Sequence, residues 1–319
     1  MIEKYDHKTI VEMFDGQVVS PVLPYDSIDA DPKTIAESTQ ASGRISVSGA
    51  QAKFAIVVEN GQLRFPKEGE RGYYILKPHP IEHYLNNREY MPVNEWLTMH
   101  IAQEVYNIET AKNCLCYFRN GEVAYLTRRF DIKNDNTKFL QEDFASAASI
   151  NEDTNGEDYK YTALSYEDCA ALIDKHVSAA MVEKHKFFRL VLFNYLICND
   201  DAHLKNFSFI SADGKDYRLT PAYDLLNTQL HLYEPHIFAL KKGLYNGMII
   251  DDTHSVTGAS FEEFGRRIGL PTKLIEMELE VFRMEKPQVK EMVENSGLPE
   301  NLARSYFMGY DYRRITLSF

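Results

Sequence analysis

Five polar side chains occur within the short segment "DDAHLKN", directly after a long apolar run. They are Asp200, Asp201, His203, Lys205 and Asn206. A carboxylate such as that of Asp201 can orient a hydroxyl group or take its proton, and an amide oxygen such as that of Asn206 can bind Mg²⁺. Taken alone, the cluster is also typical of a capped helix end with solvated charges, in which Asp200 is an incidental charge.

Other charged residues extend this cluster into a pattern. Asp201 and Asn206 have the Asp-to-Asn spacing of the protein-kinase catalytic loop. The strand-like run "YRLTPAYDLL" ends in Asp224, and a hairpin would bring this carboxylate beside Asn206 as a second Mg²⁺ ligand. Lys77, at the end of "YYILK", is the candidate cation for phosphate groups, because phosphoryl transfer is catalysed mainly by positioning and charge stabilisation. Glu95 is its candidate partner. The alternatives are an ordinary surface lysine for Lys77 and an exposed helix charge for Glu95.

The elements that must position these residues begin with a small antiparallel sheet. Strand-forming runs flank Asn60-Gly61 in "KFAIVVENGQLRF" and Asn120-Gly121 in "CLCYFRNGEVAYLTRRF", and Asn-Gly pairs favour tight hairpin turns. The segment "YYILK" is the strand between the two hairpins. Apolar residues at helical spacing then predict a helix over Asn94–Tyr106, with Asn94 as its N-cap.

After about residue 140 the pattern is mainly helical. The expected helices are Tyr166–His176, Met181–Asn199, Phe261–Ile268 and Lys273–Met284. The segment "FFRLVLFNYLI" is apolar nearly all round, which predicts a central buried helix whose end delivers the charged cluster. We therefore predict an α+β fold with a β-rich N-terminal lobe and a mainly helical C-terminal lobe. With the kinase-like spacing of Asp201 and Asn206, this order of lobes resembles a two-lobed protein-kinase-like fold.

Composition narrows the classes of function. The formal net charge of -12 argues against a nucleic-acid backbone as the main ligand, so direct nucleic-acid binding is not expected. The four cysteines show neither CxxC spacing nor the density of a disulfide scaffold, which indicates reduced thiols. The start "MIEKYDHKTI" has no signal-peptide core, and no run approaches the roughly 18 apolar residues of a membrane span. We expect a cytoplasmic protein without membrane association.

Several segments together resemble the HipA family of serine/threonine kinase toxins from bacterial toxin–antitoxin modules. In chain order these segments are "RISVSGAQAKF", "YYILK", "RRFDI", "QEDFA", "DAHLKNFS" and "YRLTPAYDLL". The resemblance runs from about Arg44 to the C-terminus. It divides the chain into an N-terminal extension (1–43), a β-rich nucleotide-binding lobe (44–140) and a helical catalytic lobe (141–319).

The resemblance implies ATP and Mg²⁺ as the small molecules used, and it implies a role for each residue of the pattern. Asp201 corresponds to the catalytic Asp, Asn206 and Asp224 to the Mg²⁺ ligands, and Lys77 to the lysine on the ATP phosphates. The implied nucleotide-binding set is Ser48, Gly49, Ala50, Gln51, Lys53, Lys77, Arg128, Phe130, His203, Lys205, Asn206 and Asp224. Thr127 and Arg128 replace an aliphatic residue and Glu of a longer member, a change that backbone contacts to adenine tolerate.

The loop "SVSGAQ" is implied to be a site of regulatory autophosphorylation at Ser46 and Ser48, with a plain polar turn as the alternative. A phosphate adds about -1.5 to -2 charge, which would weaken nucleotide binding beside it. Having both serines, and only a short N-terminal extension, makes the chain similar to the HipT-like type that lacks the extra N-terminal subdomain. The implied partners are an aminoacyl-tRNA synthetase as substrate, a helix-turn-helix antitoxin and a small protein resembling the missing subdomain.

Two other functions stay open at this point. A pseudokinase would keep the fold and bind a partner without catalysis, and a small-molecule kinase could use a related scaffold. The intact set of Lys77, Asp201, Asn206 and Asp224 favours catalysis. The segment "QEDFA" fits equally a wall of the substrate cleft and the acidic start of a helix.

Overall fold

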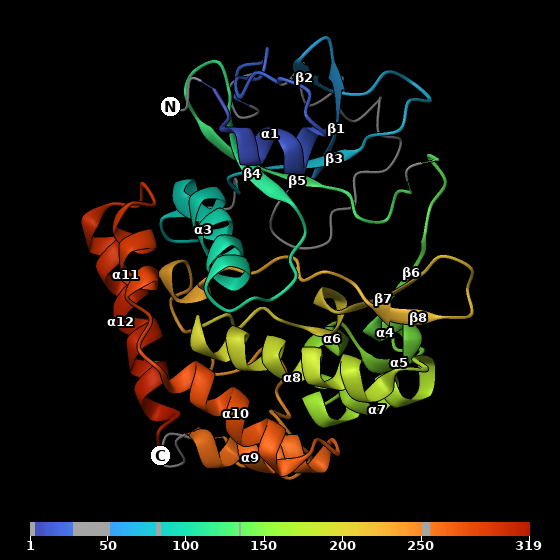
Figure 1. Cartoon of the computed structure of the whole chain (residues 1–319), viewed down its shortest axis with the longest axis vertical. Coiled ribbons are helices and arrows are strands. Elements are labelled where there is room, and N and C mark those ends of the chain that lie inside the picture. Colours follow the sequence, from blue (N-terminus) through green and yellow to red (C-terminus); the bar gives the residue numbers. More distant parts are fainter. Residues whose placement is uncertain (1–3, 28–51, 81–83, 134, 251–255) are drawn as a thin grey trace.

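The computed structural model describes residues 4–27, 52–80, 84–133, 135–250 and 256–319. Figure 1 shows two lobes, a β-rich lobe at the top and a helical lobe below it. The predicted two-lobed α+β fold is therefore confirmed. Five residues of the predicted phosphate loop lie outside the described residues, namely Ser46, Ser48, Gly49, Ala50 and Gln51.

The first predicted hairpin begins the sheet of the upper lobe. Asn60 and Gly61 have positive φ angles of 53° and 73°, the left-handed backbone that Asn-Gly turns adopt most readily. They join β1 (Phe54–Glu59) to β2 (Gln62–Arg64) in an antiparallel pair. The hairpin prediction is confirmed.

The described strands of this lobe form a five-stranded antiparallel sheet in the order β2-β1-β3-β5-β4. Strand β3 (Tyr74–Pro78) is the predicted "YYILK" strand, and β4 (Asn113–Tyr117) with β5 (Val123–Arg128) is the second predicted hairpin. Lys77 of β3 lies opposite Tyr125 of β5. Because β3 has a neighbour on each side, Lys77 is presented from the middle of the sheet.

The N-terminal residues pack on this sheet. Helix α1 (His7–Phe14) begins at Asp6, whose side chain accepts a hydrogen bond from the backbone N–H of Thr9 at 2.7 Å. Tyr5, Phe14 and Leu23 are buried in the same hydrophobic cluster as the strand residues. The lobe boundaries at residues 44 and 141 stay a prediction.

Helix α3 (Met91–Glu104) corrects one prediction. It begins three residues before Asn94, so Asn94 is not the N-cap but a fully buried residue of the first turns. The Nδ2 atom of Asn94 donates to the carbonyl of Asn227 at 2.8 Å, and its Oδ1 accepts from the N–H of Asn227 at 3.0 Å. The side chain satisfies the backbone of a distant loop, which its position in the sequence does not indicate.

Helix α8 (Ala180–Leu196) occupies the centre of the helical lobe, as predicted. Phe187, Leu192 and Phe193 on it have no exposed surface. The helix ends three residues before the predicted Asn199, because the chain turns at Cys198 with a positive φ of 57°. A β-carbon in that conformation disfavours further helix, so the polar cluster starts on a loop.

The rest of the helical lobe is built from short strands and further helices. Its other regular elements are β6 (Leu140–Asp143), α4 (Phe144–Ala147), α5 (Glu152–Asn155), α6 (Tyr159–Thr162), α7 (Tyr166–His176), β7 (Ser208–Ser211), β8 (Tyr217–Leu219), α9 (Gly258–Arg267), α10 (Thr272–Arg283), α11 (Pro287–Glu294) and α12 (Glu300–Thr316). Short 3₁₀ turns are η2 (Arg88–Tyr90), η3 (Leu204–Asn206) and η4 (Thr228–Leu230). Strands β6, β7 and β8 form a separate antiparallel sheet in that order.

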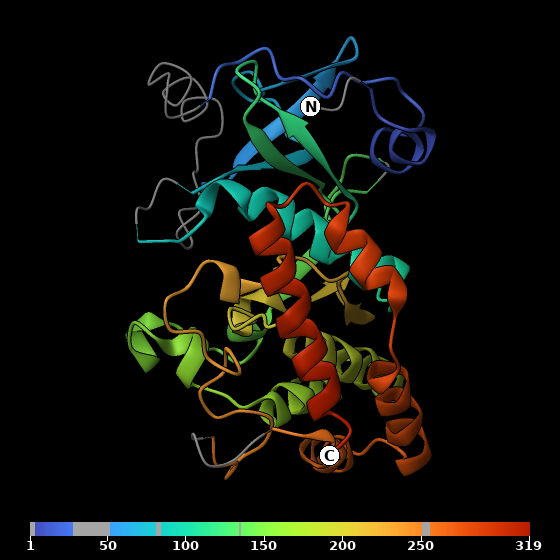
Figure 2. The ribbon, with the colours of Figure 1, turned by 90° about the vertical axis from the view of Figure 1, so that its left-hand side faces the viewer.

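Two helices beyond those expected from the sequence connect the lobes. Helix α12 runs lengthwise through the helical lobe (Figure 2) and packs on α8 and α11. Helix α11 in turn contacts α3, and Thr98 of α3 is 2.8 Å from the hydroxyl of Tyr306 on α12.

Within the described residues, no helix combines the length and apolar character that crossing a membrane would require.

The hydrogen bonds between the Asn94 side chain and the backbone of Asn227 can be tested by mutation. The Asn94→Ala variant should lose about 3 kcal/mol of unfolding free energy, because it leaves the buried N–H and C=O of Asn227 without partners. Urea denaturation of the purified protein measures the loss. As a control, Glu276→Ala on the exposed face of α10 should change it by less than about 0.5 kcal/mol. Equal losses in the two variants would contradict this role of Asn94.

Candidate active site

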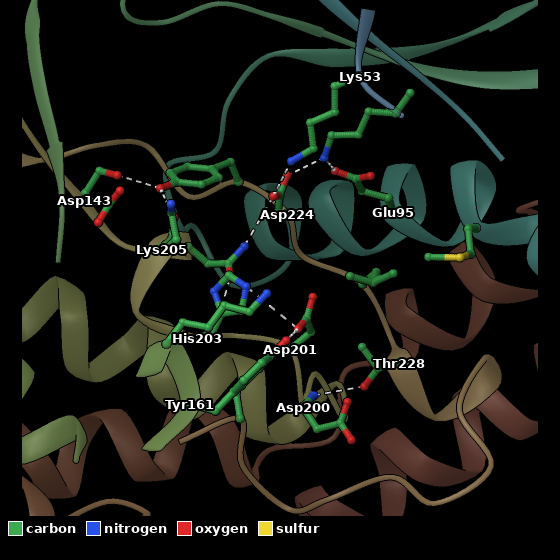
Figure 3. Close-up of a pocket in the computed structure, with 18 of the residues that line it drawn as sticks. Lys53, Glu95, Asp143, Tyr161, Asp200, Asp201, His203, Lys205, Asp224 and Thr228 are labelled. Carbon is green, nitrogen blue, oxygen red and sulfur yellow. Dashed lines mark hydrogen bonds and ion pairs between the residues drawn. The ribbon is translucent and has the colours of Figure 1, made fainter. Parts of the chain in front are cut away.

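Lys77 is the residue on which the two lobes meet. Its side chain is buried at 5% exposure, and its Nζ lies 2.6 Å from Oε1 of Glu95 on α3. The same ammonium group contacts Oδ1 of Asp224 from the helical lobe. The predicted pairing of Lys77 with Glu95 is present, and Asp224 adds a second carboxylate to it. Figure 3 labels the two carboxylates, Glu95 and Asp224.

Asp224 is held by three side chains. It lies beyond β8, which ends at Leu219 and not at Asp224 as the strand-like run suggested, and its backbone has a positive φ of 55°. The Nζ of Lys53 is 3.3 Å from Oδ2 of Asp224. Nδ2 of Asn206 donates to the same oxygen at 3.3 Å. The structure therefore brings Asn206 and Asp224 together as predicted.

The charges in this group control one another. Burial disfavours the carboxylate form of Asp224, but the adjacent Lys53 and Lys77 outweigh it and hold the pKa of Asp224 well below its ordinary value. Burial also disfavours the ammonium form of Lys77, yet Asp224 and Glu95 raise the Lys77 pKa above its ordinary value. For Glu95 the burial is stronger than the attraction of Lys77, so the Glu95 pKa is raised.

Asp201 is presented by the loop that follows α8. Its backbone N–H donates to Oδ1 of Asn199 at 3.2 Å, and the buried hydroxyl of Tyr166 donates to the carbonyl of Ala202 at 3.1 Å. The side chain of Asp201 is 50% exposed, and the hydroxyl of Tyr161 donates to its Oδ1 at 2.7 Å. The loop is thus braced from the core while its carboxylate faces the cleft.

His203 and Lys205 lie on the same wall of the cleft. His203 is buried, and this burial lowers the pKa of its imidazole. Its backbone N–H donates to Oδ1 of Asn206 at 3.3 Å, while the carbonyl of Lys205 accepts from the hydroxyl of Tyr223 at 2.9 Å. These hydrogen bonds shape the turn that carries Asn206.

Asp200 is not the incidental charge that we expected. It is buried at 7% exposure, and its Oδ2 accepts from the N–H of His236 at 2.6 Å, while its own N–H donates to Thr228 at 2.9 Å. Burial raises the pKa of its carboxyl group. An acidic pair in a sequence does not reveal which of its two members turns inward.

The segment "QEDFA" lies both at the start of a helix and at the wall of the cleft, the two positions that its sequence suggested. Asp143 caps α4, because its side chain accepts from the N–H of Ser146 at 2.9 Å. Gln141 and Asp143 also line the cleft. The helix-start interpretation is therefore confirmed for Asp143, beside the cleft.

Two predicted nucleotide-binding residues lie differently from the rest. The guanidinium group of Arg128 forms a two-pronged ion pair with Asp15, at 2.7 and 2.8 Å, and borders a second cavity of about 520 Å³. Phe130 also borders that second cavity, and its ring is 5.7 Å from the ring of Tyr223. The structure brings neither side chain to the group around Lys77.

One cleft of about 1030 Å³ between the lobes contains the other described members of the predicted set. They are Lys53, Lys77, Asp201, His203, Lys205, Asn206 and Asp224. Among the described residues no group of three or more His, Cys, Asp or Glu side chains is placed to hold a metal. Adjacent carboxylate and amide oxygens from Asp224 and Asn206 nevertheless fit Mg²⁺, which binds a few protein oxygens and completes its shell with water and phosphate.

Comparison with known proteins places this cleft in a family. Residues 45–294 match the family model described as the HipA-like C-terminal domain. A protein of Haemophilus influenzae named "Putative kinase" is 27% identical, covering 93% of this chain and 87% of its own length. Sinorhizobium fredii proteins named "Putative kinase Y4mE" and "Putative kinase Y4dM" are 29% and 31% identical. The chain spans about half of their lengths, 46% and 51%.

Solved structures share the fold. HipA of Shewanella oneidensis, determined as a toxin–antitoxin complex with HipB and operator DNA, superposes with a TM-score of 0.64 at 22% identity. The match covers 86% of this chain and 65% of that one. The Helicobacter pylori proinflammatory kinase CtkA gives a TM-score of 0.55 at 15% identity, covering 86% and 91%. Both likenesses support a kinase-like fold.

The buried charges predict how stability depends on pH. In Lys77→Met the carboxylate of Glu95 loses the ammonium group that it contacts at 2.6 Å, so we expect a loss of about 3 kcal/mol of unfolding free energy at pH 7.5. The Glu95 pKa is already raised by burial, so removing Lys77 raises it further. A folded-state pKa above the unfolded value favours the protein at low pH, and the loss should therefore be smaller at pH 5.

Urea denaturation at the two pH values checks this expectation. Lys53→Met is the matched control, because the side chain of Lys53 is 31% exposed and Asp224 keeps Lys77 when Lys53 is removed. Its loss should be smaller and nearly the same at pH 5 and pH 7.5. A Lys77→Met loss that does not shrink at pH 5 would show that Glu95 is not left unpaired.

Proposed function

The chain belongs to the HipA-like C-terminal domain family, and on that premise we propose that it is an ATP- and Mg²⁺-dependent serine/threonine protein kinase. The observation that carries the proposal is the convergence of Lys77, Glu95, Asn206 and Asp224 in one cleft, which Asp201 also lines. These residues come from both lobes. Paired charges beside an open cleft are typical of a site that handles a charged ligand such as phosphate.

Each residue has a role that its position supports. Lys77, fixed by Glu95, and Lys53 supply positive charge for the phosphate groups of ATP. Asn206 and Asp224 supply oxygens for Mg²⁺, which neutralises phosphate charge when bound. Asp201, half exposed in the same cleft, accepts a hydrogen bond from the hydroxyl of the acceptor serine or threonine.

The phosphoryl group is transferred in a single displacement. A bond forms between the acceptor oxygen and the γ-phosphorus of ATP, and the bond from that phosphorus to the bridging oxygen breaks. ADP leaves with the electron pair of the broken bond. The carboxylate of Asp201 orients the acceptor hydroxyl and takes its proton.

We also assign a role to the segment that precedes β1, which the sequence predicts to be a phosphate loop. Ser48, Gly49, Ala50 and Gln51 are assigned to the ATP phosphates, since small residues permit close approach of the backbone. Ser46 and Ser48 are assigned as autophosphorylation sites. The added charge of about -1.5 to -2 would repel ATP phosphates and reduce activity.

The biological role that we propose is the toxin of a bacterial toxin–antitoxin module. The Shewanella HipA structure, which contains HipB and operator DNA, supports a helix-turn-helix antitoxin as a partner. The substrate that we assign is an aminoacyl-tRNA synthetase, and a small protein equivalent to an N-terminal subdomain is a second possible partner. The chain's net charge of -12 supports protein and not DNA as its direct target.

One observation favours the pseudokinase as a second candidate. Both carboxylate oxygens of Asp224 contact lysines, so the group that would hold Mg²⁺ is already neutralised. A protein that never binds the metal could use the same ion pairs simply to join its lobes. Catalysis separates the two candidates.

Phosphate transfer tests the proposed reaction. Purified full-length chain, incubated with Mg²⁺ and [γ-³²P]ATP, should label itself, and mass spectrometry should locate the label on Ser46 or Ser48. Asp201→Asn and Asp224→Asn should each lower the rate about 100-fold or more, because they remove the proton acceptor and a metal ligand.

The exposed Asp216 of the β7–β8 turn provides a matched control, so Asp216→Asn should label like the wild type. Labelling that persists unchanged in both site variants would overturn the catalytic assignment. An unlabelled wild type that also leaves candidate synthetases unlabelled would favour the pseudokinase.

Growth of cells that express the chain tests the toxin role. Induction of the wild type should arrest growth, because phosphorylation of a synthetase stops translation. Induction of Asp201→Asn to the same protein level should not. Colony counts and culture density measure the difference, and equal growth with the two proteins would count against a toxin.

A further inference from the structure

Tyr161 on α6 touches the carboxylate of Asp201. Its hydroxyl donates a hydrogen bond of 2.7 Å to Oδ1 of Asp201, as Figure 3 shows. Nε2 of His203 lies 4.0 Å from the same oxygen. Among the described residues, no hydrogen bond reaches the other carboxylate oxygen, Oδ2. The two oxygens of Asp201 therefore have different surroundings.

The tyrosine is held firmly enough to keep this contact. Its ring packs edge-on against the ring of His203, with centroids 5.1 Å apart. The Nζ of Lys160 lies 4.9 Å from the centroid of the Tyr161 ring. The backbone carbonyl of Tyr161 accepts from the N–H of Lys241 at 2.8 Å. Both the ring and the main chain of Tyr161 are thus anchored to neighbouring segments.

The phenol is in its neutral, proton-donating form. Burial raises the pKa of Tyr161 above its ordinary value, and the negative charge of Asp201 raises it further. A neutral phenol beside a carboxylate donates its proton in a charge-assisted hydrogen bond. The direction of the hydrogen bond follows from these charges.

We propose that Tyr161 is a positioning residue for phosphoryl transfer, which holds Oδ1 of Asp201 so that Oδ2 faces the acceptor hydroxyl. The inference rests on the proposed kinase function. A carboxylate that is half exposed can rotate about its Cβ–Cγ bond, and acceptor orientation is lost when it does. A fixed donor on one oxygen removes that freedom while leaving the other oxygen open.

The neighbouring tyrosine has a different task. Tyr166 donates to the carbonyl of Ala202 from inside the core, so it supports the main chain of the loop and not the carboxylate. Tyr161 contacts neither Lys77 nor Asp224, which lie on the nucleotide side of the cleft. Loss of its hydroxyl should therefore affect the transfer step and spare ATP binding.

Steady-state kinetics of Tyr161→Phe tests the proposal with the full-length chain. ATP hydrolysis with Mg²⁺, in which water takes the acceptor position, supplies kcat and KM, and self-phosphorylation supplies a second rate. We expect kcat to fall about 10-fold, the size of a hydrogen bond to a charged group. The KM for ATP should change less than about 2-fold. Tyr159→Phe, on the same helix, should match the wild type.

A double-mutant cycle separates positioning from a structural role. In an Asp201→Ala background there is no carboxylate to orient, so adding Tyr161→Phe should produce no further loss of rate. Rates under single-turnover conditions, with enzyme in excess, allow the slow variants to be compared. Thermal melting should place Tyr161→Phe within about 2 °C of the wild type, since the ring is kept.

Four outcomes would overturn the inference. They are an unchanged rate in Tyr161→Phe, a loss of equal size in the Asp201→Ala background, a raised KM for ATP as the main effect, and a faster rate. A faster rate would show that the Tyr161 hydroxyl competes with the acceptor for Asp201. An active wild type with any of these results leaves the kinase function standing, whereas an inactive wild type overturns the kinase function and this inference together.

Discussion

The structure depends on the need to pair buried charges. Lys77 and Glu95 are taken out of water together, and isolated burial of either would cost several kcal/mol. Asp224, whose side chain is 23% exposed, pairs with Lys77 at the edge of the cleft. Lys77 comes from the sheet, Glu95 from α3 and Asp224 from the helical lobe. The ion pairs that satisfy these charges therefore also fix how the two lobes approach each other. The cleft lies between the two lobes, and charged residues of both lobes line it.

Uncharged contacts support the same geometry from behind. Asn94 lies one residue before Glu95 on α3, and it binds the backbone of Asn227, three residues after Asp224. Both partners of Lys77 are consequently attached to one buried hydrogen-bonded pair. Helices α11 and α12 add packing between α3 and α8. The site is thus supported by the core of both lobes, as a preorganised charged site requires.

The loop that carries Asp201 combines a buried side and an open side. Asp200 turns inward and accepts from His236, whereas Asp201 is half exposed and accepts from Tyr161. Two adjacent carboxylates thereby have different environments, and burial raises the pKa of Asp200. Tyr166 anchors the loop from the core. Because its main chain is held by these contacts, the loop presents the carboxylate of Asp201 in a defined orientation.

The sequence by itself determined much of the local structure and proposed a set of reactive residues. The Asn60-Gly61 turn predicted its hairpin, because that pair suits left-handed backbone, and the apolar run of α8 predicted the buried centre. The spacing of Asp201, Asn206 and Asp224 indicated phosphoryl transfer. Their roles in catalysis and metal binding stay predictions until the variants are measured. These inferences succeeded where the information lies in neighbouring residues.

Only the tertiary structure decided which distant residues meet. Lys77 and Asp224 are separated by 147 positions, and no local pattern shows that Asp224 joins Glu95 in pairing with Lys77. Asn94 has the residue type of an N-cap, yet it serves a backbone segment 133 positions away. The hydroxyl of Tyr161 reaches Asp201 only because α6 packs beside the loop. Contacts of this kind depend on how whole elements pack, which the composition and periodicity of any one segment do not specify.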